Sequence, residues 1–254
     1  MVSPWGHLLL CAGPGPALLT DRFLGFADDS GATGVCSGAR ASLPKFFSIH
    51  RMNIRVATAA DATYADALCQ WYIESAKQRG TGIAKRDPEY VREKMRQGNS
   101  VIAFVDGELA GFCYIETFES GKFVANSGLV VNTELRKHGL GRAIKREIFR
   151  LSRTKYPEAK IFGITTSLAV MKINSDLGYK PVTFSELTTS EDFWKGCKSC
   201  KNFGILTENE RRMCLCTGMV FDDINAPLPA VETDEDAPAI PAEMQLPVVA
   251  TTPA

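Results

Sequence analysis

The sequence predicts a domain of the α/β or α+β class, and three observations support this prediction. Segments with strand-like and helix-like hydrophobic patterns alternate between Met52 and Phe221. Hydrophobic residues make up 45% of the chain and charged residues 23%, a composition that can bury a core. The formal net charge is zero and no apolar run approaches the length that crosses a bilayer, so neither nucleic acid nor membrane is an expected partner.

Cap and turn residues set the order of the elements. Asp87 and Pro88 are typical of a helix N-cap and first helical position, and Asp106-Gly107 is typical of a two-residue hairpin turn. Gly128 lies within a strand, where glycine indicates a bulge or a close backbone approach. In chain order, the expected elements are a strand at 53–56, a helix closed by Gly80, a helix between Asp87 and Gly98, strands at 101–105, 109–118 and 122–131, a helix from Leu140, a strand at 160–165, a helix at 168–177 stopped by Gly178, and strands at 179–187 and 211–221.

Composition divides the 254 residues into three parts. Residues 1–51 are rich in Gly, Ala, Ser and Pro without a sustained period, so we expect a disordered extension or a start site assigned too far upstream. Residues 52–221 form the predicted domain, and 222–254 form an acidic, proline-rich, solvated tail. The N-terminus fits neither a secretory signal nor a mitochondrial presequence, so a cytoplasmic protein is expected.

The most informative segment runs from Val130 to Ala143, where a strand ends, a loop follows and an amphipathic helix begins. Gly139 and Gly141 let the backbone turn its N–H groups inward, and the free amides of a helix N-terminus carry partial positive charge. This combination holds a phosphate or pyrophosphate, the alternative being a helix start that binds nothing. Basic side chains at the rim are Arg136, Lys137, His138 and Arg142. Further along the helix, the basic residues expected to face water are Lys145, Arg146, Arg150 and Arg153.

Two common phosphate-binding motifs do not fit this segment. A dinucleotide fingerprint needs a third small residue where Ile144 stands, and a P-loop needs Gly-Lys-Ser/Thr. The pattern Arg136-x-x-Gly139-x-Gly141 resembles the coenzyme A pyrophosphate loop of the GNAT superfamily of N-acetyltransferases. The resemblance covers roughly 53–221 and includes a later helix that ends in Gly178-Tyr179.

The resemblance implies the acyl-CoA N-acyltransferase fold, a mixed, mostly antiparallel sheet flanked by helices. It implies an enzyme in which an amine directly attacks the thioester carbon of acetyl-CoA. Backbone amides at a bulge before the loop would polarise the thioester carbonyl, and here they come from Leu129 to Val131. The implied cofactor-binding residues are Leu129, Val130, Val131, Arg136, Lys137, His138, Gly139, Leu140, Gly141, Arg142 and Asn174.

The catalytic residues depart from the family pattern. Many relatives place a tyrosine acid four residues before the Gly of Gly-Phe/Tyr, where this chain has Asn174. An amide donates no proton at neutral pH, but it can hydrogen-bond the sulfur or the pantetheine arm. Glu116 is the nearest candidate base, acting through a water, and an exposed strand-end carboxylate is the alternative. Glu119 and Tyr114 are weaker candidates, and Tyr114 also fits the core.

The acceptor is expected to be a small-molecule amine. In this fold its site draws on the first two helices, and here their connection, Lys77–Arg86, offers arginine forks that match a carboxylate; a solvated charged turn is the alternative. Two segments are similar to those of bacterial GNAT proteins associated with arginine biosynthesis: Arg79-Gly80-Thr81-Gly82 and Gly163-Ile164-Thr165-Thr166. This resemblance implies that the acceptor is an amino acid such as glutamate. Acylation of a protein lysine or α-amine, and a non-catalytic CoA-binding sensor with a cysteine-rich interaction site, stay open. The oligomeric state is also open, a homodimer being one arrangement.

Four of the eight cysteines cluster near the C-terminal end of the predicted domain. Two close pairs separated by a hairpin-length segment have the spacing of a structural zinc site, although the second pair is tighter than usual. Reduced thiols lining the last strands are the alternative, and a redox role is a third. The candidate ligands are Cys197, Cys200, Cys214 and Cys216.

Overall fold

The computed structural model describes residues 51–80 and 85–230, so the predictions for 1–50 and 231–254 lie outside the described residues. The strands are β1 (Met52–Val56), β2 (Ser100–Val105), β3 (Glu108–Phe118), β4 (Phe123–Val131), β5 (Lys160–Thr165), β6 (Lys180–Val182) and β7 (Thr217–Phe221). The α-helices are α1 (Ala65–Arg79), α2 (Pro88–Arg96), α3 (Leu140–Lys155), α4 (Leu168–Asp176), α5 (Glu191–Lys195) and α6 (Phe203–Glu208). Short 3₁₀ helices are η1 (Ala59–Tyr64), η2 (Glu119–Gly121), η3 (Thr133–Leu135), η4 (Phe184–Glu186) and η5 (Gly196–Ser199).

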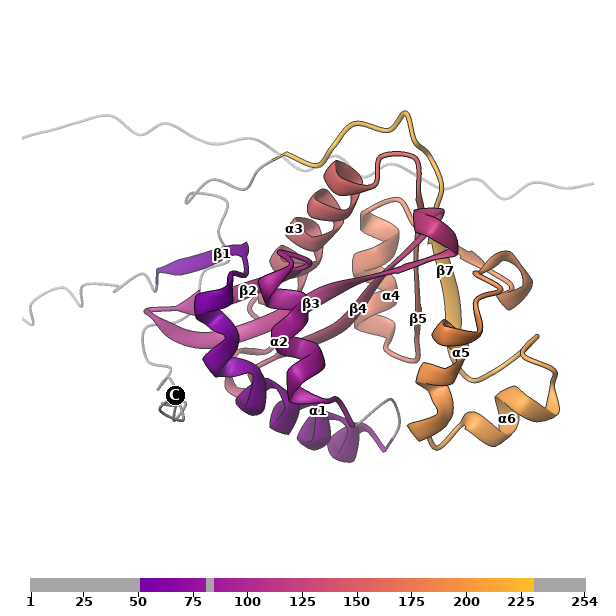
Figure 1. Cartoon of the computed structure of the whole chain (residues 1–254), viewed down its shortest axis with the longest axis horizontal. Helices are drawn as coiled ribbons and strands as arrows, with labels where there is room; N and C mark the ends of the chain where they lie inside the picture. Colours follow the sequence, from indigo (N-terminus) through magenta and orange to yellow (C-terminus); the bar gives the residue numbers. More distant parts are fainter. Residues whose placement is uncertain (1–50, 81–84, 231–254) are drawn as a thin grey trace, which may run out of the picture. The chain divides into compact units, whose positions relative to one another are not determined.

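The strands form one seven-stranded sheet in the order β1-β2-β3-β4-β5-β7-β6 (Figure 1). Neighbouring strands pair antiparallel, except that β4 and β5 are parallel. The parallel pair is joined through α3, because parallel neighbours need a crossover connection. This is the mixed, mostly antiparallel sheet that the sequence predicts.

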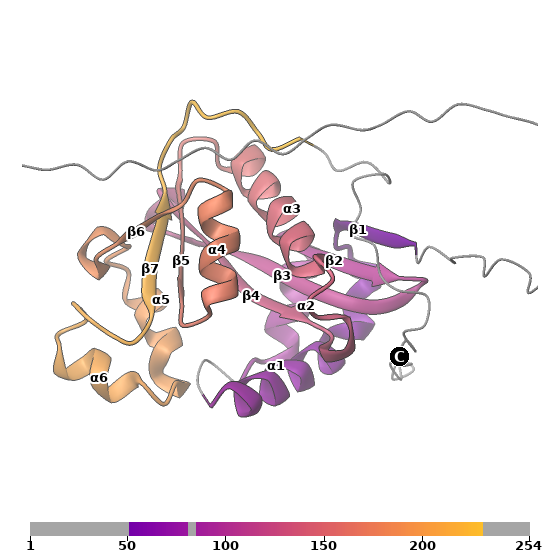
Figure 2. The same cartoon turned by 180° about the vertical axis from the view of Figure 1, so that it is seen from behind.

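Helices cover both faces of the sheet. On one face, α3 and α4 lie side by side and enclose a core that includes Ile144 and Ile148 (Figure 2). On the other face, α1 and α2 pack over β2 and β3 around Leu68, Phe112 and Tyr114. On this second face the α5–α6 segment has its own apolar cluster, centred on Phe162 and Trp194. No helix among the described residues is long and apolar enough to span a membrane.

Local turn chemistry follows the predictions in the first half of the domain. The residues between β2 and β3, Asp106 and Gly107, have φ values of 50° and 88°, the left-handed pair that a type I′ hairpin turn requires. The side chain of Asp87 accepts a hydrogen bond of 2.9 Å from the Glu89 amide and caps α2, with Pro88 in the first turn. The hairpin and the start of α2 are therefore confirmed.

The segment after α4 differs from the prediction. The strand expected over 179–187 is only the three-residue β6, whose Pro181 lacks the N–H that a longer ladder would use. The strand expected from 211 begins at Thr217, because Glu210 and Arg211 have positive φ values and form a turn after α6. Between them lie α5, η5 and α6, whose short lengths leave little hydrophobic period to read.

Two basic residues of α3 that were expected to face water are buried instead. Lys145 is 2% exposed, and its ammonium lies 5.5 Å from the centre of the Tyr179 ring. Arg153 is 7% exposed and donates to the carbonyls of Asp223, Ile224 and Ala226, just after β7. The Tyr179 ring takes the place of water around Lys145, and three carbonyls do so around Arg153. The helical period of the sequence cannot reveal such partners.

Candidate functional site

The two parallel strands of the sheet pair only at their beginnings. β4 pairs with β5 over Phe123–Ala125, while its pairing with β3 runs on to Val131. β5 continues to Thr165 with β7 as its partner. From Asn126 onward, the described residues provide no β5 ladder for this edge of β4. The second half of β4 therefore offers backbone groups to something other than β5.

A bulge lies in this second half of β4. Tyr114 of β3 pairs with Ser127 and Phe112 pairs with Val130, so two residues of β4, Gly128 and Leu129, oppose one residue of β3. Gly128 has φ of 65°, and a Cβ there would lie 2.2 Å from the Tyr114 ring. The bulge predicted at Gly128 is confirmed, and only glycine fits it.

The loop after β4 leads into α3 through left-handed backbone. Lys137 has φ of 73°, and Gly139, the residue before the helix, has φ of 82°. The N–H groups of Gly139, Leu140 and Gly141 have no acceptor within the helix, because they belong to its first turn. That turn contains no acidic side chain. The helix start therefore has the charge and the free donors that suit an anion.

The cations at the rim of this loop divide into two kinds. Arg136 reaches back to α1, where its guanidinium donates to Gln78 at 2.9 Å and to Ser75 at 3.4 Å. Arg142 is ion-paired with Asp176 of α4. Lys137 is exposed and His138 is partly exposed. Arg136 and Arg142 thus also tie the loop to neighbouring helices, whereas Lys137 and His138 lie at the surface.

On the α1–α2 face, a second set of polar groups adjoins the bulge. The hydroxyl of Tyr72 on α1 donates to the Gly128 carbonyl at 2.5 Å. Arg86, just before α2, donates from Nε to the Tyr114 hydroxyl at 2.8 Å, and its guanidinium lies 5.4 Å from the Tyr72 ring centre. Burial raises the pKa of both tyrosines above the usual range, so both stay protonated. An arginine and two phenols therefore lie together behind the bulge.

Glu116 belongs to the same group. It is partly exposed at the end of β3, and its carboxylate accepts a hydrogen bond of 2.6 Å from the Tyr90 hydroxyl of α2. The Tyr90 ring packs against Tyr114 with centres 5.9 Å apart, and the Lys94 ammonium lies 4.9 Å from its centre. The candidate base Glu116 is thus held by α2 at the outer end of this set of polar side chains.

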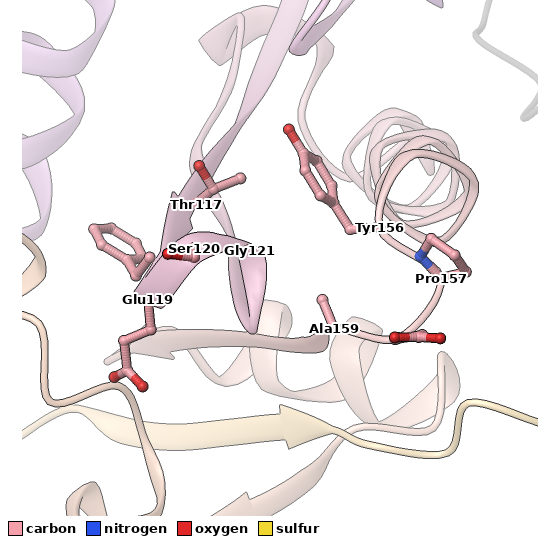
Figure 3. Close-up of a pocket in the computed structure, with 9 residues that line it drawn as sticks. Thr117, Glu119, Ser120, Gly121, Tyr156, Pro157 and Ala159 are labelled. Atoms are coloured by element: carbon pink, nitrogen blue, oxygen red, sulfur yellow. The ribbon is translucent and has the colours of Figure 1, made fainter.

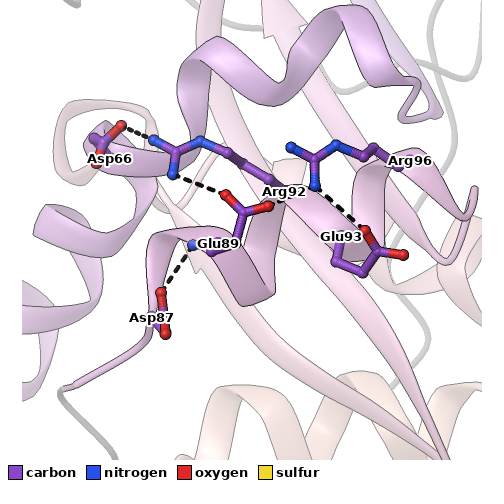
Figure 4. A network of polar contacts seen from close by, with 6 residues as sticks. All are labelled: Asp66, Asp87, Glu89, Arg92, Glu93 and Arg96. Atoms are coloured by element: carbon purple, nitrogen blue, oxygen red, sulfur yellow. Dashed lines mark hydrogen bonds and ion pairs between the residues drawn. The ribbon is translucent and has the colours of Figure 1, made fainter.

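Surface ion pairs lie along α2 and reach α1 (Figure 4). Arg92 pairs with Glu89 on its own helix and with Asp66 on α1. Arg96 pairs with Glu89 at 2.6 Å. Exposed pairs of this kind contribute little each. Their effect here is to link α1 to α2 next to the polar group.

Sequence reasoning missed Tyr72 and Tyr90. Of the neighbouring aromatic residues Trp71 and Tyr72 on α1, the buried one is Tyr72, four positions after Leu68. That i, i+4 spacing was the available signal. Tyr90 was not singled out, although it stands four residues before Lys94 on α2.

The two predicted catalytic residues are not brought together. Asn174 lies on α4, which packs on the opposite face of the sheet from the α2 helix that holds Glu116. It is 2% exposed, and its Nδ2 donates to the Met219 sulfur at 3.7 Å. Its Oδ1 is buried and has no hydrogen-bond partner among the described residues. Asn174 is therefore an orphaned acceptor beside β7.

A hollow of about 460 Å³ lies at the other end of β4, between the β3–β4 connection and the α3–β5 connection (Figure 3). Its lining includes Glu119, whose carboxylate accepts from the Thr188 hydroxyl at 2.7 Å and from the Thr189 amide at 2.8 Å. These bonds anchor the segment that leads into α5. Glu119 is thus engaged in holding the fold, and none of the predicted cofactor-binding residues lines this hollow.

The four clustered cysteines are free thiols. Asn202 links the two pairs, because its N–H donates to Cys200 at 3.5 Å and its carbonyl accepts from Cys214 at 3.8 Å. Burial raises the pKa of Cys197 to about 11 and that of Cys216 to about 12. Within the described ranges, no three His, Cys, Asp or Glu side chains are grouped as metal ligands. The predicted zinc site thus finds no support in this arrangement.

Comparisons with known proteins bear on this geometry. Residues 65–167 match the model of the acetyltransferase (GNAT) family, a range that contains the bulge and the loop. No curated protein matches the chain. At these residues, the loop identified from the sequence and the family model coincide.

Similar solved structures include N-acetylglutamate synthase from Neisseria gonorrhoeae, complexed with coenzyme A and N-acetyl-glutamate, at 19% identity and a TM-score of 0.47. That match covers 67% of this chain and 34% of the synthase, so the chain spans about a third of its length. Rv2747 from Mycobacterium tuberculosis, in complex with CoA, has 15% identity and a TM-score of 0.48 over 67% of this chain and 98% of its own.

Ribosomal-protein-alanine N-acetyltransferase from Brucella melitensis has 17% identity and a TM-score of 0.46, over 67% of this chain and 99% of its own. These likenesses are too distant to assign an acceptor. The family model and the bulge-and-loop geometry lead to one conclusion: this chain contains an acetyltransferase domain of the GNAT family.

Proposed function

We propose that this protein transfers the acetyl group of acetyl-CoA to the amine of a small molecule, an amino acid such as glutamate. The observation that carries the proposal is the arrangement of β4. β4 leaves β5 at Asn126, bulges at Gly128 and is followed by a loop that leads into the first turn of α3 at Gly139. In one cofactor that carries both, the thioester needs the N–H groups of the bulge and the diphosphate needs the helix start that follows it.

The diphosphate of coenzyme A is proposed to lie against the first turn of α3. Its charge suits the free amides there and the exposed Lys137 and His138 beside them. The proposed cofactor-binding residues remain Leu129, Val130, Val131, Arg136, Lys137, His138, Gly139, Leu140, Gly141, Arg142 and Asn174. Support for Asn174 comes from its orphaned Oδ1, which a pantetheine amide N–H would satisfy.

The acetyl step is proposed to use the bulge and Glu116. The acceptor nitrogen forms a bond to the thioester carbon while the C–S bond breaks and its electron pair leaves on sulfur. Backbone N–H groups of Leu129 to Val131 stabilise the charge that develops on the carbonyl oxygen. Glu116, acting through a water, takes the proton that the amine loses, and solvent protonates the thiolate.

The acceptor is proposed to bind on the α1–α2 face, with its α-carboxylate on Arg86. Three observations support this. Arg86 adjoins the bulge through Tyr72 and Tyr114, it is partly exposed, and it has no carboxylate ion-pair partner in the part of the chain that the structure describes. A guanidinium with free donors matches a carboxylate, and the nearby Glu116 suits an amine.

Thiol release from acetyl-CoA by the full chain tests the proposal. We expect turnover with glutamate or another amino acid, and much slower turnover with the decarboxylated amine of the same side chain. Glutamine beside glutamate reports whether the side-chain carboxylate matters. Turnover only with peptides would favour a protein substrate, CoA binding without turnover would favour the sensor, and neither binding nor turnover would refute both.

The remaining predictions stay proposals. Cys197, Cys200, Cys214 and Cys216 are proposed to hold a structural zinc ion, and the support for this is their spacing in the sequence alone. Metal analysis of the purified protein, with one zinc per chain expected, decides this. A cytoplasmic location and a homodimer are proposed on the sequence alone.

A further inference from the structure

Tyr72 is a buried tyrosine that bonds the backbone of a distant strand. It lies on α1 with 5% of its surface exposed, and its hydroxyl donates to the Gly128 carbonyl at 2.5 Å. The acceptor is at the β4 bulge, 56 positions along the chain. A tertiary side-chain bond therefore reaches the one peptide of β4 that the bulge removes from the regular ladder.

The geometry of that peptide couples the bond to a second group. Every peptide bond of the described residues is trans. In a planar trans peptide the C=O of one residue and the N–H of the next point in opposite directions. The carbonyl of Gly128 points to α1, so the N–H of Leu129 points away from α1. Holding the carbonyl therefore also holds the direction of this N–H.

The register of β3 against β4 passes over this peptide. The β3 ladder holds Ser127 on one side of the bulge and Val130 on the other. Between these two positions, the positive φ of Gly128 gives the peptide a conformation that a regular ladder does not impose. The Tyr72 bond is a side-chain contact that restrains its rotation.

We propose that Tyr72 is a positioning residue for acetyl transfer: its hydroxyl holds the Gly128–Leu129 peptide so that the Leu129 N–H meets the thioester carbonyl oxygen. The proposal rests on the function proposed above. Tyr72 makes or breaks no bond in the reaction. It keeps the donor aimed at the oxygen where negative charge develops, which costs no reorganisation during the step.

Two further observations fit this role. Burial raises the pKa of Tyr72 well above its usual range, so the hydroxyl is a donor throughout the working pH range. The ring itself is held by the Arg86 guanidinium, 5.4 Å from its centre. The phenol is therefore fixed at both its ring and its hydroxyl.

The test is Tyr72→Phe in the full chain, which removes one oxygen and keeps the ring. We expect kcat to fall roughly 10- to 100-fold, less than the roughly 100- to 1,000-fold for losing an oxyanion donor, because the donor is misaimed and not removed. The Kd for coenzyme A, measured by calorimetry, is expected to stay within about twofold, since the diphosphate lies at α3. Tyr156→Phe, the same change at the distant hollow, is the matched control.

Backbone NMR gives a readout that a purely structural role would not move. In the unmodified protein, the Leu129 amide is expected to shift more on binding acetyl-CoA than on binding coenzyme A, and Tyr72→Phe is expected to abolish the difference. Unchanged kcat beside an active parent, or an unchanged Leu129 shift, would overturn this inference alone. An inactive parent would overturn the proposed function instead.

Discussion

The two faces of the sheet both bury polar side chains, but they satisfy them differently. Under α3 and α4, the Asn126 amide donates to the Tyr179 hydroxyl at 3.2 Å and accepts from Ser152 at 2.7 Å, so these groups complete one another. Under α1 and α2, Tyr72 bonds a backbone carbonyl at the bulge and Arg86 bonds Tyr114 beside a partly exposed Glu116. One face closes on itself, and the other leaves charged groups available.

This contrast separates polar side chains that only hold the fold together from polar side chains that are able to bind a ligand. A closed network gains nothing from a ligand, because its donors and acceptors are already used. A network that ends in a guanidinium and a carboxylate, neither of them in a close ion pair among the described residues, retains binding capacity. Two residues on the closed face are exceptions among the described residues. Lys145 has an aromatic ring but no ion-pair partner, and the Oδ1 of Asn174 has no hydrogen-bond partner.

The largest expected effect comes from breaking the bulge on the open face with Gly128→Ala. The new Cβ would lie 2.2 Å from the Tyr114 ring and 2.8 Å from the Tyr72 hydroxyl, at a φ that alanine rarely adopts. We expect turnover to fall at least roughly 100-fold, as for loss of an oxyanion donor. Gly107→Ala, also at positive φ but with open space around it, is the control. Turnover near that of the control would contradict the role of the bulge.

An intermediate effect is expected from removing the charge of the open face with Arg86→Leu. The KM for an amino acid acceptor should rise roughly 10- to 100-fold, the value of a hydrogen-bonded charge pair, while the Kd for coenzyme A stays the same. Arg96→Leu, which removes an exposed arginine of the α2 ion pairs, is the matched control. An equal loss for acceptors with and without a carboxylate would show that Arg86 acts through Tyr114 rather than on the acceptor.

The smallest expected effect comes from the closed face. Burial lowers the pKa of Lys145 from its ordinary value of 10.5, so the unfolded chain binds this proton more readily than the folded chain. The associated stability is complete above pH 10.5 and is lost as the pH falls toward the native pKa. Lys145→Met should therefore raise the free energy of unfolding by about 1 kcal/mol at pH 8, with less gain at pH 10.

Urea unfolding at the two pH values measures this change. Lys172→Met, at an exposed position of α4, should stay within about 0.5 kcal/mol of the parent. A clear loss of activity in Lys145→Met would mean that Lys145 serves the reaction, and its assignment to the purely structural polar groups would fail.

Much of the fold and half of the site followed from local chemistry. Some positions need a particular backbone conformation, and the residue type alone predicts it. These positions are Asp106-Gly107, Asp87-Pro88 and Gly128. The loop at Gly139 was identified for the same reason. These features depend on a few neighbouring residues and are therefore legible in one sequence.

The rest depended on contacts between distant segments. Tyr72 matters because α1 crosses β4 at Gly128, and Lys145 is buried because Tyr179 lies over it. The helical spacing indicates that Tyr72 is buried, but it does not indicate which strand Tyr72 meets. It gives no sign that Lys145 is buried. The α5–α6 segment was missed because its helices are short. Hydrophobic periods report faces of long elements, and these residues act across elements.

Arg153 has a consequence for where the chain can be shortened. Its guanidinium is capped by main-chain oxygens from Asp223 to Ala226, beyond the last strand, and it lies 4.9 Å from the Phe221 ring centre. A protein cut directly after Phe221 would retain every strand of the described sheet yet leave a buried cation without these acceptors. The unit that must be kept intact for crystallisation or display is thus a few residues longer than its sheet.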